Sequence, residues 1–176
     1  TVMKKIQKVE KMAKTGGDKE AKKAYEVCTV IKTHLESGKS ARTAPIAEED
    51  KEYIADLFLL TVKPVLYVCN VDEGSVNTGN EFVDRVKDAV KEENAEVLII
   101  SAKIESEIAE LESYEERQEF LQDLGLEESG VAKLIRAAYR LLNLATYFTA
   151  GVQEVRAWTI EKGWTAPQAA GVIHTD

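Results

Sequence analysis

The chain has 176 residues, a formal net charge of −8, 44% apolar residues and 31% charged residues. This composition supports a hydrophobic core and is ordinary for a globular domain. No apolar run approaches the ~20 residues that a membrane-spanning helix requires, so we expect no membrane partner.

Charge is distributed unevenly along the chain. Residues 1–47 carry eleven Lys or Arg against five Asp or Glu, whereas residues 48–128 carry seven against twenty-three. A basic segment beside an acidic body suggests a polyanionic partner such as RNA. The candidate contacts are Lys4, Lys5, Lys8 and Lys11. A solvated lysine-rich helical face explains the same charges equally well.

Two helices are predicted in residues 1–36, because apolar residues recur there at three- and four-residue spacing. The stripes are Val2, Ile6, Val9 and Ala13, followed by Ala21, Tyr25, Cys28, Ile31 and Leu35. The glycines of residues 15–17 suit the end of the first helix, and Asp18 suits the N-cap of the second. We therefore expect an antiparallel helical hairpin.

A linker is predicted after the hairpin, in residues 38–45. Residues 37–40 (SGKS) imitate the end of a phosphate-binding loop, GxxxxGK[ST]. However, Thr33 stands where the first glycine belongs, and a helix precedes the segment instead of a strand. Without those features the backbone amides cannot form a phosphate nest.

A short helix over Tyr53, Ile54, Leu57 and Phe58 is predicted next, and then a strand. Residues 64–73 (PVLYVCNVDE) read as a strand covered on both faces, which ends in an Asn-x-x-acid turn. A helix over residues 80–93 with Phe82, Val86 and Val90 on one face follows. Residues 95–104 (AEVLIISAKI) then give a second buried strand, which completes a right-handed β-loop-α-β unit.

The ends of these two strands form the candidate site. Loops at the carboxyl ends of parallel strands are where ligands bind in α/β sheets. An Asn-x-x-acid loop beside a Ser-Ala-Lys loop is the arrangement that holds a purine base in GTPase-type sites. The predicted nucleotide-binding residues are Asn70, Val71, Glu73, Ser101, Ala102 and Lys103. The alternative is an ordinary turn that caps the following helix.

The remainder of the chain supplies helices and a hairpin. Acidic helices are predicted over residues 105–123, with a break at Gly125, and another helix over 131–143. Residues 146–149 and 154–160 alternate as a β-hairpin, and residue 166 begins a helix. Cys28 and Cys69 lack CxxC spacing, so we expect free thiols and no disulfide. His34 and His174 have no ligand partners at metal spacing, so neither a metal site nor a catalytic residue is predicted.

Several segments of the chain together resemble one family, the Obg-like ATPases of the YchF type. The segments that carry the resemblance are residues 63–73 (KPVLYVCNVDE), 101–105 (SAKIE), 126–130 (LEESG) and 147–176, which include YFTAG, RAWTI and APQAAGVIHTD. The resemblance implies an α/β fold: the carboxyl-terminal part of a P-loop NTPase (Rossmann-like) domain with an inserted antiparallel helical hairpin, and the start of a small β-rich TGS (α+β) domain. The implied domains are residues 1–45, 46–145 and 146–176.

The resemblance also implies a function for the parent protein. It implies hydrolysis of ATP, and of GTP more weakly, with Mg²⁺, together with ribosome or RNA binding in the cytoplasm. The family's phosphate-binding loop, its magnesium-binding Ser or Thr and its Asp-x-x-Gly loop have no counterpart here. We therefore expect a fragment that does not hydrolyse nucleotide alone. The alternatives are a non-catalytic RNA- or ribosome-binding module and an inert remnant.

The base loop differs from the guanine-specific Asn-Lys-x-Asp sequence at two positions. Val71 replaces the Lys, and Glu73 replaces the Asp that accepts from guanine. The Asn70 amide still suits the purine N7 edge, and Lys103 places its stem over the ring. The Ala102 N–H would face purine position 6, where it suits guanine better, so adenine needs a local shift or a bridging water.

Overall fold

The computed structural model describes residues 1–14, 18–93 and 95–173. It divides into two compact units, Thr1–Pro64 and Val65–Asp176. The predicted glycine turn at residues 15–17 and His174 lie outside the described residues.

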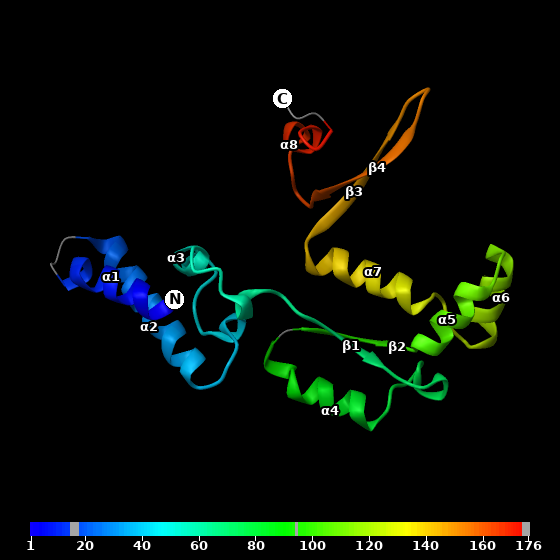
Figure 1. Cartoon of the computed structure of the whole chain (residues 1–176), viewed down its shortest axis with the longest axis horizontal. Coiled ribbons are helices and arrows are strands. Elements are labelled where there is room, and N and C mark those ends of the chain that lie inside the picture. Colours follow the sequence, from blue (N-terminus) through cyan, green and yellow to red (C-terminus); the bar gives the residue numbers. More distant parts are fainter. Residues whose placement is uncertain (15–17, 94, 174–176) are drawn as a thin grey trace. The chain divides into compact units, whose positions relative to one another are not determined.

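The first unit is built on two long helices, α1 (Val2–Lys14) and α2 (Lys19–Glu36), which pack against each other (Figure 1). Asp18 caps α2 as predicted, because its Oδ1 accepts a hydrogen bond from the Ala21 N–H at 3.0 Å. Short elements follow: η1 (Ala41–Thr43), η2 (Glu49–Lys51), α3 (Glu52–Ala55) and η3 (Leu60–Val62). The SGKS segment follows α2 and precedes η1, so its surroundings are those of a linker.

The core of this unit extends beyond the hairpin. Its buried members come from α1, α2 and the segment after them: Val2, Val27, Cys28, Ile31, Ala41, Ile54 and Leu57. Because Ile54 and Leu57 bury their side chains against the hairpin, the compact unit continues to Pro64, past the predicted hairpin boundary at residue 45.

The helix predicted over residues 53–58 is shorter than expected. It ends at Ala55, and Phe58 adopts a positive φ of 47° with 85% of its surface exposed. The backbone N–H groups of Leu57 and Phe58 bond to the carbonyls three residues earlier, so the last turn tightens and the chain turns away. Placing Phe58 in that helix was therefore wrong.

The second unit begins with the predicted β-loop-α-β unit. Strand β1 (Leu66–Asn70) pairs in parallel with β2 (Glu96–Ile100), so that Asn70 lies opposite Ile100. The connection contains η4 (Glu73–Ser75), α4 (Glu81–Ala89) and η5 (Lys91–Glu93). Asn80 starts α4, since its side chain accepts from the N–H groups of Phe82 and Val83 at 3.1 Å each.

Two expectations about burial in this part were wrong. Val68 of β1 is 41% exposed, so the described residues do not cover the strand fully on both faces of this two-stranded sheet. Phe82 is 62% exposed, whereas Val83 and Val90 are buried. Of the predicted apolar face, Val90 is buried and Val86 is half-buried as expected, so only Phe82 was misplaced, and the buried Val83 was missed.

Helices α5 (Ala102–Glu110), α6 (Tyr114–Asp123) and α7 (Gly130–Leu141) follow β2. Gly125 has a φ of +67°, which ends the acidic helical stretch as predicted. A second core of Val76, Ile104, Leu121 and Leu126 lies beneath the loops that follow β1 and β2. Val71, the first residue after β1, packs against this core.

The last part of the chain confirms the predicted β-hairpin. Strand β3 (Leu144–Ala150) pairs with β4 (Val155–Glu161) in antiparallel register, and α8 (Ala166–Ala170) follows. Trp158 donates its Nε1–H to Thr149 Oγ1 at 2.9 Å, and Tyr147 donates its hydroxyl to the Ala169 carbonyl at 3.0 Å. The face of the hairpin that carries Tyr147 and Trp158 is therefore the face bonded to α8.

Candidate functional site

The two loops predicted to hold a purine lie next to each other. Because β1 and β2 are parallel and in register to their last residues, both chains leave the sheet at the same edge. The pairing continues one residue further, since the Val71 N–H donates to the Ile100 carbonyl at 2.9 Å.

A direct hydrogen bond joins the loops. The Asn70 side-chain Oδ1 accepts from the Ala102 backbone N–H at 2.9 Å. With its oxygen engaged, the Asn70 carboxamide retains its Nδ2 group, which is a pure donor. Asn70 and Ala102 are both exposed, so this donor is accessible from solvent.

The loop after β1 has a turn-forming residue that is not Glu73. Asp72 Oδ1 accepts from the Ser75 N–H at 3.0 Å and from its hydroxyl at 2.9 Å, and so starts η4. Val71 packs its side chain on the core beneath the loop. The capping role that was the alternative explanation of this sequence therefore belongs to Asp72, and Glu73 has no part in it.

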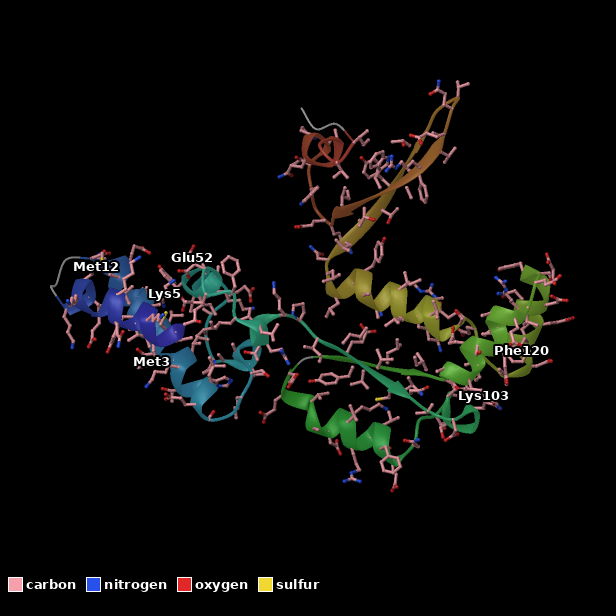
Figure 2. The ribbon with its side chains drawn as sticks, in the orientation of Figure 1. Met3, Lys5, Met12, Glu52, Lys103 and Phe120 are labelled. Carbon is pink, nitrogen blue, oxygen red and sulfur yellow. The ribbon has the colours of Figure 1, made fainter. Side chains whose placement is uncertain are left out.

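Glu73 forms an ion pair with Lys103 across the two loops. Lys103 also lies 3.7 Å from Glu107, and its side chain remains 70% exposed at the start of α5 (Figure 2). The hydrogen bond to Glu73, together with the negative charges of Glu73 and Glu107, raises the pKa of Lys103 above its ordinary value of 10.5. Lys103 is therefore a firmly charged group over the strand ends.

Ser101 lies beneath this surface. It is only 1% exposed, and it forms the N-cap of α5 without a side-chain capping bond. Its Oγ has no hydrogen-bond partner among the described residues. Of the Ser-Ala-Lys sequence, Ala102 and Lys103 thus face solvent and Ser101 faces inward.

One residue of the site was missed as a candidate. Glu105 accepts from the backbone N–H groups of Gly130 at 2.6 Å and Val131 at 3.1 Å, which places α7 against α5. It joins two of the segments that carry the family resemblance, SAKIE and LEESG. Their joint presence was the available signal, but no spacing rule connects positions 105 and 130.

The predicted RNA-binding lysines do not form one set. Lys4, Lys8 and Lys11 are exposed on α1, whereas Lys5 pairs with Asp56 and leaves only 17% of its side chain exposed (Figure 2). Lys5 therefore holds the hairpin to the segment after it.

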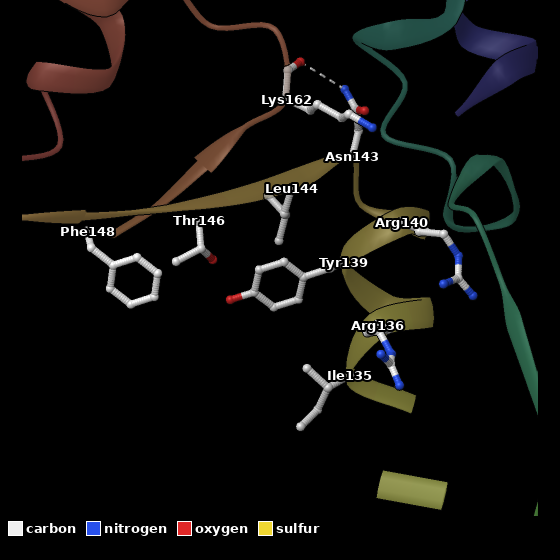
Figure 3. Close-up of a pocket in the computed structure, with 9 residues that line it drawn as sticks. All are labelled: Ile135, Arg136, Tyr139, Arg140, Asn143, Leu144, Thr146, Phe148 and Lys162. Carbon is white, nitrogen blue, oxygen red and sulfur yellow. Dashed lines mark hydrogen bonds between the residues drawn. The ribbon is translucent and has the colours of Figure 1, made fainter. Parts of the chain in front are cut away.

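A hollow lies elsewhere in the second unit, between α7 and β3, with a volume of about 610 Å³ (Figure 3). Tyr139 of α7 points toward Thr146 and Phe148 of β3 and bonds to Thr159 Oγ1 at 3.2 Å. The hydrogen bond with Thr159, and a second with Thr146, lower the pKa of Tyr139 below its ordinary value of 10.0. None of the residues that line this hollow is among the predicted nucleotide-binding residues at the strand ends.

The described residues contain neither a metal-binding cluster nor a membrane-spanning helix. No group of three or more His, Cys, Asp or Glu side chains in these residues is arranged to hold a metal ion. Within residues 1–14, 18–93 and 95–173, no helix combines the length and apolar character needed to cross a membrane. Cys28 and Cys69 are both free thiols.

Known proteins resemble this chain along nearly its whole length. The "Ribosome-binding ATPase YchF" of Bacillus subtilis is 52% identical over 178 residues, and the match covers 100% of this chain and 48% of the relative. The protein of the same name from Escherichia coli O157:H7 is 49% identical, with 97% and 46% covered. The "Obg-like ATPase 1" of Gallus gallus is 39% identical, with 97% and 44% covered.

A solved structure and a family model agree with these relatives. The Schizosaccharomyces pombe YchF GTPase superposes with a TM-score of 0.77 at 31% identity, over 99% of this chain and 50% of that one. Residues 144–176 match the family model YchF-GTPase_C, described as a protein of unknown function (DUF933). The chain spans about half the length of the relatives that it matches. By sequence and by fold, the chain belongs to the Obg-like ATPase family of the YchF type, with the α/β architecture of the carboxyl-terminal part of its P-loop GTPase-like domain.

Proposed function

We propose that the ends of β1 and β2 form the base-binding end of a nucleotide site, in a protein that hydrolyses ATP and, more weakly, GTP. The residues that would hold the nucleoside are Asn70, Val71, Glu73, Ser101, Ala102 and Lys103. The observation that carries the proposal is the 2.9 Å hydrogen bond from Ala102 to Asn70, at the edge where two parallel strands end.

The donor pattern of this edge suits a purine. The Asn70 Nδ2 group is a donor in a position to meet the N7 acceptor of the ring, while Oδ1 is held by Ala102. The aliphatic stem of Lys103 can cover one ring face. Val71 and Ser101 support the loops from below, since Val71 packs on the core and Ser101 is buried.

Two contacts favour adenine over guanine. The Ala102 N–H already donates to Asn70, so it no longer presents a free donor to purine position 6, which is an amine in adenine. Glu73 is paired with Lys103, which draws its carboxylate away from the guanine N1–H and 2-amino donors. The first contact removes the mismatch between the Ala102 N–H and the adenine 6-amine that the sequence suggested.

The phosphate chemistry would be supplied by other parts of the protein. In phosphoryl transfer the phosphates and Mg²⁺ are held by a glycine-rich loop and oxygen ligands, and positioning does most of the catalysis. The SGKS segment follows a helix and lacks the first glycine, so it does not fit that role. We therefore expect no hydrolysis by these 176 residues alone, and release of inorganic phosphate from ATP by them would contradict this expectation.

The base site is best tested by nuclear magnetic resonance, because binding without phosphate contacts is weak. Adenosine added to the ¹⁵N-labelled chain should shift the amide signals of residues 70–75 and 101–105. Asn70→Ala should abolish these shifts, whereas Gln122→Ala, which removes an exposed amide side chain on α6, should leave them unchanged. The proposal fails if adenosine leaves both loops unaffected or perturbs only other surfaces.

A second function, RNA or ribosome binding by the helical hairpin, is favoured by the exposed lysines of α1 and by the names of the bacterial relatives. The same names support a cytoplasmic location for the parent protein. Lys4→Glu, Lys8→Glu and Lys11→Glu together should weaken RNA binding and flatten its dependence on salt, because phosphate contacts release counterions. Lys87→Glu on α4 is the control. If RNA binding is unchanged by the three α1 substitutions, this function is excluded.

A further inference from the structure

The amino-terminal end of α7 is held by a carboxylate that belongs to α5. Glu105 Oε1 accepts from the Gly130 N–H at 2.6 Å, and Oε2 accepts from the Val131 N–H at 3.1 Å. The first N–H groups of a helix have no partner within the helix and carry partial positive charge, so a carboxylate binds them strongly. One side chain therefore joins the two helices at this point.

The contact is too close for a side chain at position 130. A Cβ on Gly130 would lie 2.9 Å from Glu105 Oε1 and 2.9 Å from Ile100 Cγ2. Ile100 is the last residue of β2 and lies opposite Asn70 in the sheet. The contact between Glu105 and Gly130 therefore lies beside the same strand end that carries the proposed base loop.

The first turn of α5 depends on contacts from outside the helix. Ala102 is its first residue, and the Glu105 N–H donates to the Ser101 carbonyl at 3.0 Å, so Ala102 and Glu105 belong to one turn. Ser101 provides no side-chain cap. The turn is instead held by Asn70 at Ala102 and by α7 at Glu105.

The other end of α7 is fixed as well. Arg140 pairs with Glu96, the first residue of β2, at 2.6 Å. Tyr139 bonds to Thr159 of β4, and the Lys162 N–H after β4 donates to the Asn143 carbonyl at 2.7 Å. These bonds join the carboxyl-terminal end of α7 to the β3–β4 hairpin, and Figure 3 shows Tyr139 pointing toward Thr146 and Phe148 of β3.

We propose that Glu105 is a positioning residue that couples the base loop to α7. Occupation of the strand ends would fix Ala102, and with it the Glu105 carboxylate, which in turn would stabilise the first turn of α7. Coupling of this kind is reciprocal, so loss of the Glu105 contact must also weaken the base site. The ligand rests on the function proposed above, but the link between Ala102 and α7 exists without any nucleotide.

The link can be measured by amide hydrogen exchange of the ligand-free chain. Glu105→Gln keeps the shape of the side chain but removes its charge and one acceptor. It should accelerate exchange at Gly130 and Val131, and also at Ala102, by about tenfold each, and weaken adenosine binding by a similar factor. Glu110→Gln, on an exposed position of the same helix, should change none of these values.

Each outcome decides one question. Faster exchange at Gly130 and Val131 with Ala102 unchanged overturns the coupling, whether or not adenosine binds. Absence of adenosine binding to the unmodified chain overturns the base site alone, because the exchange result does not depend on it. If Glu105→Gln does not fold, Gly130→Ala gives the same reading from the α7 side, since its Cβ displaces the carboxylate.

Discussion

At the scale of single residues, Gly130 decides how closely two helices approach. Alanine normally stabilises a helix by about 1 kcal/mol relative to glycine. Here the added Cβ meets two atoms at 2.9 Å, so we expect Gly130→Ala to destabilise the chain by about 1–3 kcal/mol. Urea unfolding measures the effect. Gly74→Ala is the control, because its Cβ meets only a carboxylate oxygen at 3.4 Å, and a smaller loss at Gly130 than at Gly74 would refute the argument.

The pKa values of two tyrosines should be shifted in opposite directions from the ordinary value of 10.0. The 2.6 Å hydrogen bond to Glu20 raises the pKa of Tyr53 to about 12, whereas Thr159 and Thr146 lower the pKa of Tyr139. The folded chain holds the Tyr53 proton more tightly than the unfolded chain does, so this bond stabilises the fold below pH 10.0 and its contribution is lost as the pH rises through about 12. In an ultraviolet titration, Tyr53→Phe should remove the last ionising group and Tyr139→Phe an early one; the reverse order would contradict both assignments.

At the scale of elements, the sequence predicted which helices and strands exist better than it predicted which face of each helix is buried. The strands that end at Asn70 and Ile100, the hairpin β3–β4 and the cap at Asp18 all follow from local patterns. Phe58 and Phe82 were placed on apolar faces because they are large and apolar, yet both are exposed. Periodicity fixes which residues share a face, but the neighbouring element decides which face is buried. The Glu105 contact was not predictable for the same reason, since its partners are 25 and 26 residues away.

The cap at Asp18 gives a test at this scale. Its side chain satisfies the Ala21 N–H in the first turn of α2, the longest contributor to the core of the first unit. Asp18→Ala should lower the free energy of unfolding by about 1 kcal/mol, whereas Asp18→Asn should retain most of it. Thermal unfolding followed by circular dichroism provides the measurement. Equal losses in the two variants would show that charge, and not capping geometry, is responsible.

At the scale of the whole molecule, each of the two compact units has a core of its own. The core built on Ile31 and Cys28 lies entirely within Thr1–Pro64, and the core built on Ile104 and Leu121 lies entirely within Val65–Asp176. Separate cores imply that neither unit needs the other to bury its apolar side chains. We therefore expect residues 1–64 alone to remain helical, even though a unit of this size is only marginally stable.

The comparison that tests this expectation uses residues 1–64 and the whole chain side by side. Amide signals of α2 around Cys28 should coincide in the two samples. Ile31→Ala should unfold the short piece. In the whole chain, the same substitution should leave the signals of Asn70 and Ala102 in place. This outcome follows because Ile31 is fully buried in the first core and contributes nothing to the second. If Ile31→Ala also moves the signals of the strand ends, the base site depends on the hairpin, and the two units act as one folding unit.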